Sequence, residues 1–325
     1  MMRETQAWVV PEIGKPLELR QMSIKIEQPD DVLVDVRATG LNFADLLMTE
    51  GKYQETPEPP FVPGMEIAGV VEAVGSNVTG FAPGDRVMSV PNNGGLASAV
   101  VVKADQLRHT PAAMTDDIAA GFQITYGSSH LALTRRAHLA PGETLVVLGA
   151  AGGVGLTAGE IGHQLGARVV AVARGAEKLA VAKAAGADVL IDSDGGDLLA
   201  ALRDAGPADV VYDAVGGSAG ETALRILAPE GRFLIIGFAS GTLPTLKPNH
   251  LLVKNQTVIG FYWGGYRNFR PEAIENSLSE LCAWHESGRI RPHIGKVIPF
   301  ESAPEGLKLL RNRAVSGKVV ISGAP

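Results

Sequence analysis

The pattern of hydrophobic and polar positions changes character near Asp116. Before that point, short apolar runs such as AWVV, DVLVDVRATG, EIAGVVEAVG and SAVVV are separated by turns rich in Gly and Pro. Their alternation and β-branched content predict a small, mostly β domain. After Asp116, helix-like stretches alternate with apolar strands, which predicts a doubly wound parallel sheet in an α/β domain.

The alternating region gives specific elements. We expect helices over residues 116–133, 154–165, 178–185, 197–204, 220–227 and 271–288. The expected strands are TLVVLGA, RVVAVA, DVLID, DVVYDAV, GRFLIIGF and TVIGFYW. After residue 290 the chain returns to mixed strand and helix. We therefore place one domain at residues 119–289 and the other at residues 1–118 plus 290–325.

The segment TLVVLGAAGGVG, residues 144–155, is the clearest chemical motif. An apolar strand runs through a glycine-rich turn into a helix, whose first amides are suited to a pyrophosphate. A flexible loop before a weak helix is the alternative interpretation. The second strand at the expected distance favours a dinucleotide cradle.

The end of that second strand indicates which dinucleotide. A carboxylate there would bind a free ribose 2′-hydroxyl, but the chain has Ala173 followed by Arg174, with Lys178 one turn later. This basic pair suits a 2′-phosphate and predicts NADPH. The alternative is a solvated pair of surface cations.

Composition excludes several classes of function. The 325 residues are 46% hydrophobic and carry a net charge of −6 without a basic stripe, so no nucleic-acid partner is expected. No apolar stretch is long enough for a membrane span, and no membrane partner is expected. Cys282 is the single cysteine, read as a packed thiol, which predicts a cytoplasmic protein without disulfides. Histidines lack metal-binding spacing, so we expect no metal.

Several motifs, taken in order, are shared with a known family. They are GLNFAD (40–45), GKY (51–53), PGMEIAG (63–69), PGDRV (83–87), the glycine-rich loop, VYDAVG (211–216) and GKVV (317–320). The chain resembles the zinc-free quinone oxidoreductase, zeta-crystallin-like branch of the medium-chain dehydrogenase/reductase superfamily. The resemblance implies a Rossmann domain inserted into a GroES-like, mostly β catalytic domain.

The resemblance also bears on the reaction. Zinc alcohol dehydrogenases of this superfamily carry Cys and His where this chain has Asn42 and Met65, so a catalytic zinc is not expected. The implied activity is hydride transfer from NADPH to a quinone or activated alkene. Alternatives are reduction of a 2-alkenal or enoyl thioester, or a non-catalytic NADPH-binding protein.

Site residues are carried over position by position. Ala150, Gly152 and Gly155 match the dinucleotide fingerprint, and the amides of Gly153 and Val154 should face the pyrophosphate. Ala173, Arg174 and Lys178 complete the adenosine end. Thr125, Gly237 and Phe238 are expected near the nicotinamide, although Thr125 alternatively bonds within its helix.

The resemblance implies that Asn42, Asp45 and Tyr53 line the nicotinamide and substrate cleft. Asn42 would donate a hydrogen bond to the substrate oxygen, and Tyr53 would form an aromatic wall or donate a proton. The competing interpretation is turn-stabilising polar side chains and a surface Tyr. The strand TVIGFYW is a candidate sheet edge for a homodimer.

Overall fold

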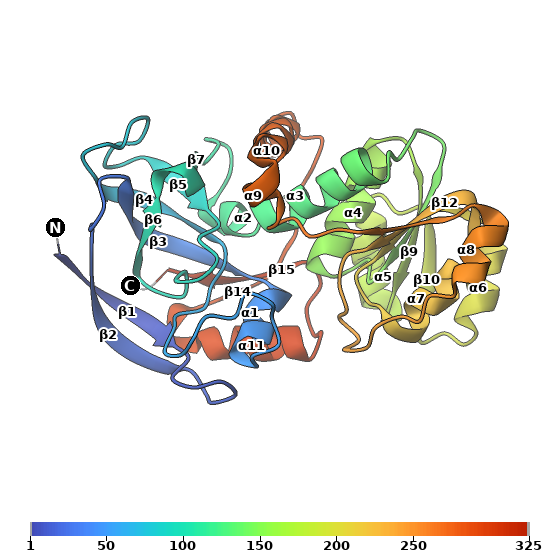
Figure 1. The fold of residues 1–325 in the computed structure, drawn as a ribbon, viewed down its shortest axis with the longest axis horizontal. Helices are drawn as coiled ribbons and strands as arrows, with labels where there is room; N and C mark the ends of the chain where they lie inside the picture. The colour runs from blue at the N-terminus through green and yellow to red at the C-terminus, as the bar shows by residue number, and fades with distance from the viewer. Residues whose placement is uncertain (1, 324–325) are drawn as a thin grey trace. The chain divides into compact units, whose positions relative to one another are not determined.

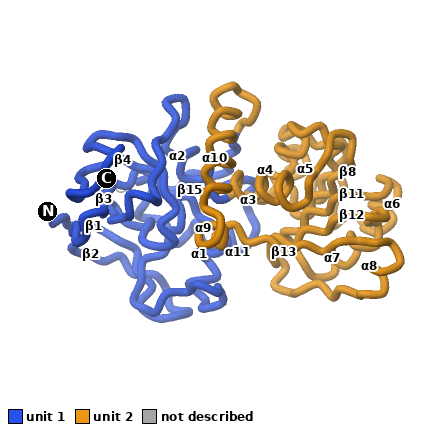
Figure 2. Tube along the Cα trace, turned by 45° about the horizontal axis from the view of Figure 1, so that its top comes forward, with its two compact units in different colours: residues 1–124, 292–325 blue, residues 125–291 orange. Residues whose placement is uncertain are grey.

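The computed structural model describes residues 2–323, which divide into two compact units. Unit 1 extends to Ile124 and resumes at Pro292, and unit 2 comprises Thr125–Arg291 (Figure 2). The structure divides the chain at 124/125 and 291/292, a few residues after the predicted boundaries at 118/119 and 289/290.

Unit 1 is mostly β, as its alternating sequence predicts. Its strands are β1 (Met2–Val9), β2 (Glu18–Lys25), β3 (Asp31–Leu41), β4 (Ile67–Val74), β5 (Arg86–Ser89), β6 (Ala99–Lys103), β7 (Leu107–His109), β14 (Ile294–Ile298) and β15 (Lys318–Ser322). Its helices are α1 (Phe43–Thr49), α2 (Asp116–Ala120) and α11 (Ala303–Arg311), with 3-10 turns at Ala104–Gln106 and Phe300–Ser302.

The long strand β3 organises unit 1. The seven-stranded sheet has the order β14-β15-β3-β4-β5-β7, with β6 also paired to β3, while β1 and β2 form a separate hairpin (Figure 1). Buried Val32, Val34 and Val36 alternate along β3 and pack with Ile67 and Val71. The C-terminal strand β15 is thereby joined to a strand from the start of the chain.

Unit 2 is the doubly wound domain. Its strands are β8 (Thr144–Leu148), β9 (Arg168–Ala173), β10 (Val189–Asp192), β11 (Ala208–Asp213), β12 (Leu227–Ile235) and β13 (Thr257–Gly260). Its helices are α3 (Gln123–Leu131, beginning at the division), α4 (Gly153–Gln164), α5 (Gly175–Ala184), α6 (Leu198–Ala205), α7 (Gly217–Leu224), α8 (Pro248–Lys254), α9 (Tyr266–Phe269) and α10 (Pro271–Glu286), and Ala132–Arg136 forms a π-helical turn.

The six strands of unit 2 follow the order β10-β9-β8-β11-β12-β13, and every pairing is parallel. This is the dinucleotide-binding order, in which the first strand lies at the centre of the sheet. Nearly continuous apolar strands such as RVVAVA are buried on both faces, which explains their lack of alternation. The predicted Rossmann and GroES-like combination is confirmed.

Several element predictions were wrong in detail. The helix expected over residues 220–227 ends at Leu224, and Leu227 instead begins β12. The helix expected over residues 116–133 is broken, because Gly121 ends α2 and α3 begins at Gln123. The strand expected to continue to Trp263 ends at Gly260. β13 does lie at one edge of the sheet, as predicted.

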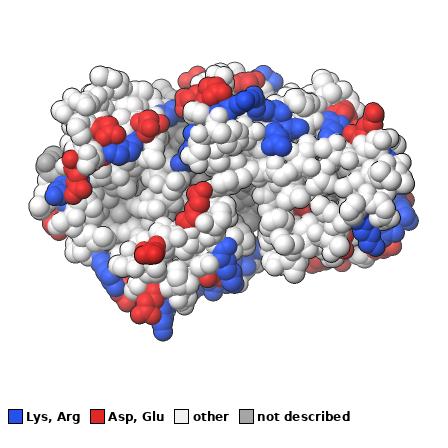
Figure 3. All heavy atoms as spheres, in the orientation of Figure 1, with Lys and Arg blue, Asp and Glu red and all other residues white. Residues whose placement is uncertain are grey.

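Two surface properties are relevant to partners. On the face in Figure 3, Lys and Arg lie interspersed with Asp and Glu, and no continuous basic band crosses the described side chains. Among residues 2–323, no helix combines the length and apolar character that crossing a membrane requires.

Candidate cofactor and substrate site

The glycine-rich turn of unit 2 is fixed to the neighbouring strand. β8 ends at Leu148, and Gly149 follows with a φ of +72°, a conformation that favours glycine. The N–H groups of Gly149 and Ala150 both donate to the carbonyl of Val172 on β9, at 3.0 Å. The turn is therefore a rigid connection into α4.

Two glycines of the fingerprint differ in what surrounds them. A Cβ on Gly155 would lie 2.2 Å from the carbonyl oxygen of Gly149, so the fold itself requires glycine there. A Cβ on Gly152 would lie 3.4 Å from the same oxygen, an ordinary contact, and Gly152 is exposed with φ of −77°. The fold leaves space for a Cβ at Gly152. A phosphate bound against the backbone would need that same space.

The start of α4 has the chemistry of an anion site. The first amides of a helix lack acceptors within the helix. No side chain of residues 2–323 caps this end, because Gly152 occupies the N-cap position. The amides of Gly153 and Val154 remain available, and the helix dipole favours negative charge beside them. A dinucleotide pyrophosphate fits these groups.

The region predicted to bind the adenosine end of the cofactor contains an acidic feature that the sequence did not predict. Ala173 ends β9 and Arg174 precedes α5, on which Lys178 lies. The Nε of Arg174 lies 3.2 Å from an oxygen of Asp194, and both side chains are exposed. An exposed pair of this kind is worth little. A 2′-phosphate on Arg174 would compete with Asp194.

The adjacent Asp192 shapes the same loop. Its Oδ1 accepts hydrogen bonds from the N–H groups of Gly175 and Asp194, each at 3.0 Å. These bonds, and then the charge of Arg174, lower the pKa of Asp192. The loop therefore combines two carboxylates with the cation predicted to hold a phosphate.

The loops after β11 and β12 are joined at Asp213. Its carboxylate accepts from the amides of Val215 and Gly216 at 2.8 Å, and its carbonyl accepts from Gly237 at 3.2 Å. Burial raises the pKa of Asp213, while these amide bonds oppose the rise. Asp213 thereby fixes Gly237 beyond the carboxyl end of the sheet. The neighbouring Phe238 side chain is 40% exposed and available to a ligand.

A buried hydroxyl network supports the predicted nicotinamide residue Thr125. The Thr157 hydroxyl lies 3.0 Å from the carbonyls of both Thr125 and Val154. Ser129 Oγ lies 2.8 Å from the Thr157 hydroxyl and 3.0 Å from that of Tyr212. The network ties α3 to α4 and β11, and so connects Thr125 with the start of α4, the helix predicted to bind the phosphates.

In unit 1, Asp45 braces the turn that carries Asn42. One carboxylate oxygen accepts from the Asn42 amide at 2.8 Å and the other from the Gly64 amide at 3.0 Å. Asp45 is completely buried, and desolvation raises its pKa to about 6 against the lowering effect of these bonds. This geometry favours a structural role for Asp45 over the predicted catalytic one.

The Asn42 side chain meets a buried ion pair. Lys318 Nζ lies 2.9 Å from a carboxylate oxygen of Glu66, with side-chain exposures of 6% and 0%. Lys318 also donates to Asn42 Oδ1 at 2.9 Å, and Asn42 Nδ2 donates to Glu66 and to the Gly40 carbonyl, both at 3.2 Å. The predicted donor role of Asn42 therefore requires a substrate oxygen to replace one of these acceptors.

Tyr53 lies beside the same region. It is half-buried and packs against a cluster formed by Val10, Met48, Phe61 and Met65. Asn42 and Met65, which the resemblance places at the ligand positions of zinc dehydrogenases, offer an amide and a thioether. Within residues 2–323, no group of three or more His, Cys, Asp or Glu side chains is placed to hold a metal ion.

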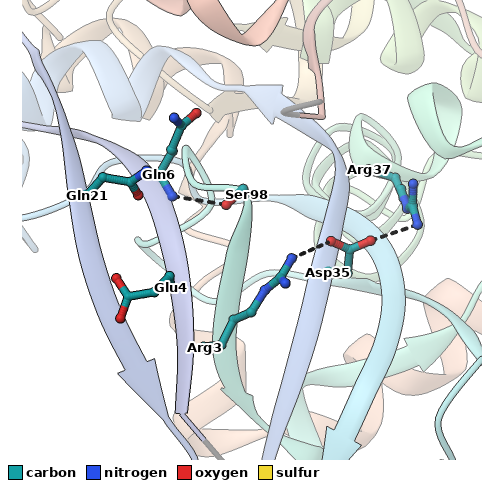
Figure 4. A pocket seen from close by; sticks show the side chains of 7 residues that line it. All are labelled: Arg3, Glu4, Gln6, Gln21, Asp35, Arg37 and Ser98. Atoms are coloured by element: carbon teal, nitrogen blue, oxygen red, sulfur yellow. Dashed lines mark hydrogen bonds and ion pairs between the residues drawn. The ribbon is translucent and has the colours of Figure 1, made fainter.

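The surface pocket shown in Figure 4 is a separate feature of unit 1. Its volume is about 430 Å³, and its polar lining comes from Arg3, Glu4, Gln6, Gln21, Asp35, Arg37 and Ser98. Asp35 lies 3.7 Å from Arg3 and 2.8 Å from Arg37. The residues predicted for the cofactor and substrate lie elsewhere.

Sequence reasoning did not assign functions to Glu66, Lys318 or Asp213. All three occur in the motifs PGMEIAG, GKVV and VYDAVG. The sequence feature that could have identified them is a charged residue in or next to an apolar strand. Such a residue is unusual unless its charge is paired or hydrogen-bonded.

Comparisons with known proteins agree with this architecture. Family models match at residues 28–112, the alcohol dehydrogenase GroES-like domain, and at residues 153–280, the zinc-binding dehydrogenase. Quinone oxidoreductase-like protein 2 of Bos taurus is 37% identical over 324 residues, covering 98% of this chain and 93% of that protein.

Solved structures give the same result. The quinone oxidoreductase of Thermus thermophilus, also determined with NADPH, is 33% identical with a TM-score of 0.86, and covers 98% of this chain and 99% of that one. CurK enoyl reductase is 25% identical with a TM-score of 0.88, and covers 99% of this chain and 100% of that one.

Proposed function

Because the chain belongs to the quinone oxidoreductase-like branch of the medium-chain dehydrogenases/reductases, a superfamily of NAD(P)-binding oxidoreductases, we propose a specific activity for it. It is an NADPH-dependent reductase that uses no zinc. Its acceptor is a quinone or an activated alkene. The observation that carries this proposal is the start of α4, which has no side-chain cap. There a Cβ on Gly155 would clash with the Gly149 carbonyl, whereas a Cβ on Gly152 would not.

Residues of unit 2 would hold the cofactor. The pyrophosphate would lie against Gly152 and the amides of Gly153 and Val154. Ala173 leaves the position of a ribose-binding carboxylate empty, and Arg174 and Lys178 would bind the 2′-phosphate. Each charge-assisted bond of this kind contributes roughly 1.5–3 kcal/mol. Thr125, Gly237 and Phe238 would bind the nicotinamide end.

Residues of unit 1 would hold the acceptor. When bound, NADPH supplies a hydride, which leaves negative charge on an oxygen of a quinone or enone. Asn42 would donate a hydrogen bond to that oxygen, and Tyr53 would present its ring to the acceptor. Asp45 would keep the Asn42 turn in place through its two amide bonds.

The residue types at the zinc positions support zinc-independent chemistry. An amide at Asn42 and a thioether at Met65 are poor replacements for a thiolate and an imidazole. Quinones and enones accept hydride without the strong Lewis acid that an alcohol–ketone reaction needs. Stoichiometric zinc in the purified protein, found by metal analysis, would refute this part of the proposal.

Similarity to CurK enoyl reductase favours a second candidate, reduction of a 2-alkenal or enoyl thioester. Steady-state assays with NADPH and 1,2-naphthoquinone, acrolein or crotonyl-CoA distinguish the substrates. We expect the highest kcat/KM with the quinone. A higher kcat/KM with crotonyl-CoA would show that enoyl thioesters, and not quinones, are the preferred acceptors. If NADPH binds and no acceptor oxidises it, the chain is instead a non-catalytic NADPH-binding protein.

We also propose that the protein acts as a cytoplasmic homodimer. The cytoplasmic location rests on the single cysteine. The dimer rests on two features of unit 2: β13 is an edge strand of the sheet, and Leu252 and Val253 of α8, the helix before β13 in the chain, are 78% and 74% exposed.

A further inference from the structure

Three adjacent strands of unit 1, β15, β3 and β4, bring together a trio made of one cation, one carboxylate and one neutral amide (Figure 1). β15 pairs with β3 so that Val319 lies opposite Leu41, and β3 pairs with β4 so that Thr39 lies opposite Ile67. Lys318 precedes Val319, Asn42 follows Leu41 at the end of β3, and Glu66 precedes Ile67 at the start of β4. Their side chains meet through the hydrogen bonds described above.

The trio fixes the direction of the Asn42 carboxamide. A lysine ammonium carries only donors, and an ionised carboxylate carries only acceptors. Asn42 must therefore turn Oδ1 toward Lys318 and Nδ2 toward Glu66, which agrees with the distances of 2.9 and 3.2 Å. The hydrogen bonds determine this assignment of the amide oxygen and nitrogen.

We propose that Lys318 and Glu66 are positioning residues, which aim and polarise the Asn42 carboxamide toward the oxygen of the acceptor. This inference rests on the proposed function. A cation bound to the amide oxygen draws electron density from the amide nitrogen, so its N–H groups become stronger donors. Glu66 holds the ammonium in place and compensates its charge.

Asn42 is the least buried of the three side chains. Asn42 is half-buried, whereas Lys318 and Glu66 are buried, so Asn42 is the member of the trio that a ligand reaches. The bond from Asn42 Nδ2 to the Gly40 carbonyl is 3.2 Å, at the long end of the usual range. An oxygen that gains negative charge is a stronger acceptor than a backbone carbonyl and would displace it.

The methylene chain of Lys318 passes close to the position that a side chain on Gly121 would occupy. A Cβ on Gly121 would lie 3.1 Å from Lys318 Cγ and 3.2 Å from Cε. The φ of Gly121 is −109°, which alanine tolerates. Gly121→Ala therefore displaces the ammonium without removing its charge.

The test uses a charge-neutral double variant, because Lys318→Met alone leaves Glu66 buried without its partner. In both Lys318→Met and Lys318→Met/Glu66→Gln, kcat with NADPH and 1,2-naphthoquinone should fall roughly 10- to 100-fold, while NADPH affinity is unchanged. The double variant should recover the thermal midpoint but not kcat. Lys318→Arg should recover part of kcat, and Gly121→Ala should give an intermediate loss.

Lys296→Met is the matched control, because Lys296 is exposed on the neighbouring strand β14. It should change neither kcat nor stability. The side-chain amide protons of Asn42 give a readout that does not depend on turnover. Their NMR resonances should shift further upfield in Lys318→Met/Glu66→Gln than in Glu66→Gln alone, because both variants lose the carboxylate acceptor and only the double variant also loses the cation on the amide oxygen.

The outcomes separate two failures. If the wild-type protein reduces no acceptor, the proposed function fails, and the Asn42 resonances still test the polarisation. If the wild-type protein is active and the double variant recovers kcat together with stability, the trio is merely structural and the inference is overturned. Equal Asn42 resonances in the double variant and in Glu66→Gln would also overturn it.

Discussion

Gly152 and Gly155 stand three residues apart at the start of α4, yet the Gly149 carbonyl restricts them differently. A Cβ would lie 2.2 Å from that oxygen at Gly155 and 3.4 Å from it at Gly152. The protein's own packing therefore requires glycine at Gly155. At Gly152, the requirement would come from a ligand. Substitutions at Gly155 should therefore affect folding, and substitutions at Gly152 should affect cofactor binding.

Gly152→Val should abolish detectable NADPH binding, because its side chain would occupy the position of the pyrophosphate. The free energy of unfolding should change by less than about 1 kcal/mol, since the φ of −77° suits valine. Gly155→Ala should instead destabilise the protein by about 1–3 kcal/mol or more. Calorimetric titration and denaturant unfolding measure the two effects.

A third glycine provides the control. At Gly159, a Cβ would make an ordinary contact of 3.8 Å with Val169 Cγ1. Gly159→Ala should stabilise the protein by up to about 1 kcal/mol and leave NADPH binding unchanged. Wild-type affinity in Gly152→Val would show that no phosphate approaches this turn.

Arg174→Ala should weaken NADPH binding roughly 10- to 100-fold and NADH binding much less, because only NADPH carries the 2′-phosphate. Asp194→Asn should strengthen NADPH binding by removing the carboxylate that lies 3.2 Å from Arg174. Competitive displacement of a fluorescent coenzyme analogue measures both affinities.

Lys183→Ala is the charge-matched control for Arg174→Ala. Lys183 is exposed on the same helix, in its last turn. It should leave the ratio of NADPH to NADH affinity unchanged. Equal losses of both coenzymes in Arg174→Ala would refute the 2′-phosphate role.

Asp45 predicts a specific pH dependence. Its pKa is raised from 3.8 to about 6, so the folded protein binds more protons than the unfolded one between these values. Its contribution to stability is complete below pH 3.8 and is lost as pH rises through about 6, a change of about 3 kcal/mol. The wild-type advantage over Asp45→Asn should therefore shrink by most of this amount between pH 4 and 7.

Denaturant unfolding of both proteins across this pH range tests the effect of Asp45. The chemical shift of its carboxyl carbon reports the titration directly. A stability difference that is independent of pH, or a midpoint near 3.8, would contradict the assigned burial effect.

The proposed dimer predicts a change in molecular mass. Leu252→Glu/Val253→Glu places two carboxylates on exposed apolar positions of α8, and should convert the homodimer to a monomer in sedimentation equilibrium. Leu190→Glu is the control, because Leu190 lies on β10 at the opposite edge of the sheet. A monomeric wild type, or a dimer that survives the double substitution, would rule out this interface.

The sequence predicted the local features of unit 2 because they depend on neighbouring residues. The run from Thr144 to Gly155 contains the strand, turn and helix start, and apolar strands identify the parallel sheet. Gly155 is an example, since its need for glycine comes from the Gly149 carbonyl in the same turn. Contacts between residues this close in the chain can be predicted from the motif.

Long-range contacts could not be predicted in this way. Lys318 and Glu66 are 252 residues apart, and only the pairing of β15, β3 and β4 joins them at Asn42. The Asp194 carboxylate was also missed, because the loop after β10 turns back to Arg174. The sequence also could not show that Asp45 is buried while Asn42 is only half-buried, although both lie in one motif, and this difference in burial gives the two residues different roles.

Calorimetric titration of the wild-type protein with NADPH and with NADH tests the central claim most directly. We predict saturable binding of one NADPH per chain, with NADH at least about tenfold weaker because it lacks the phosphate contacts. Absence of heat with both coenzymes, or equal affinity for the two, would contradict the account.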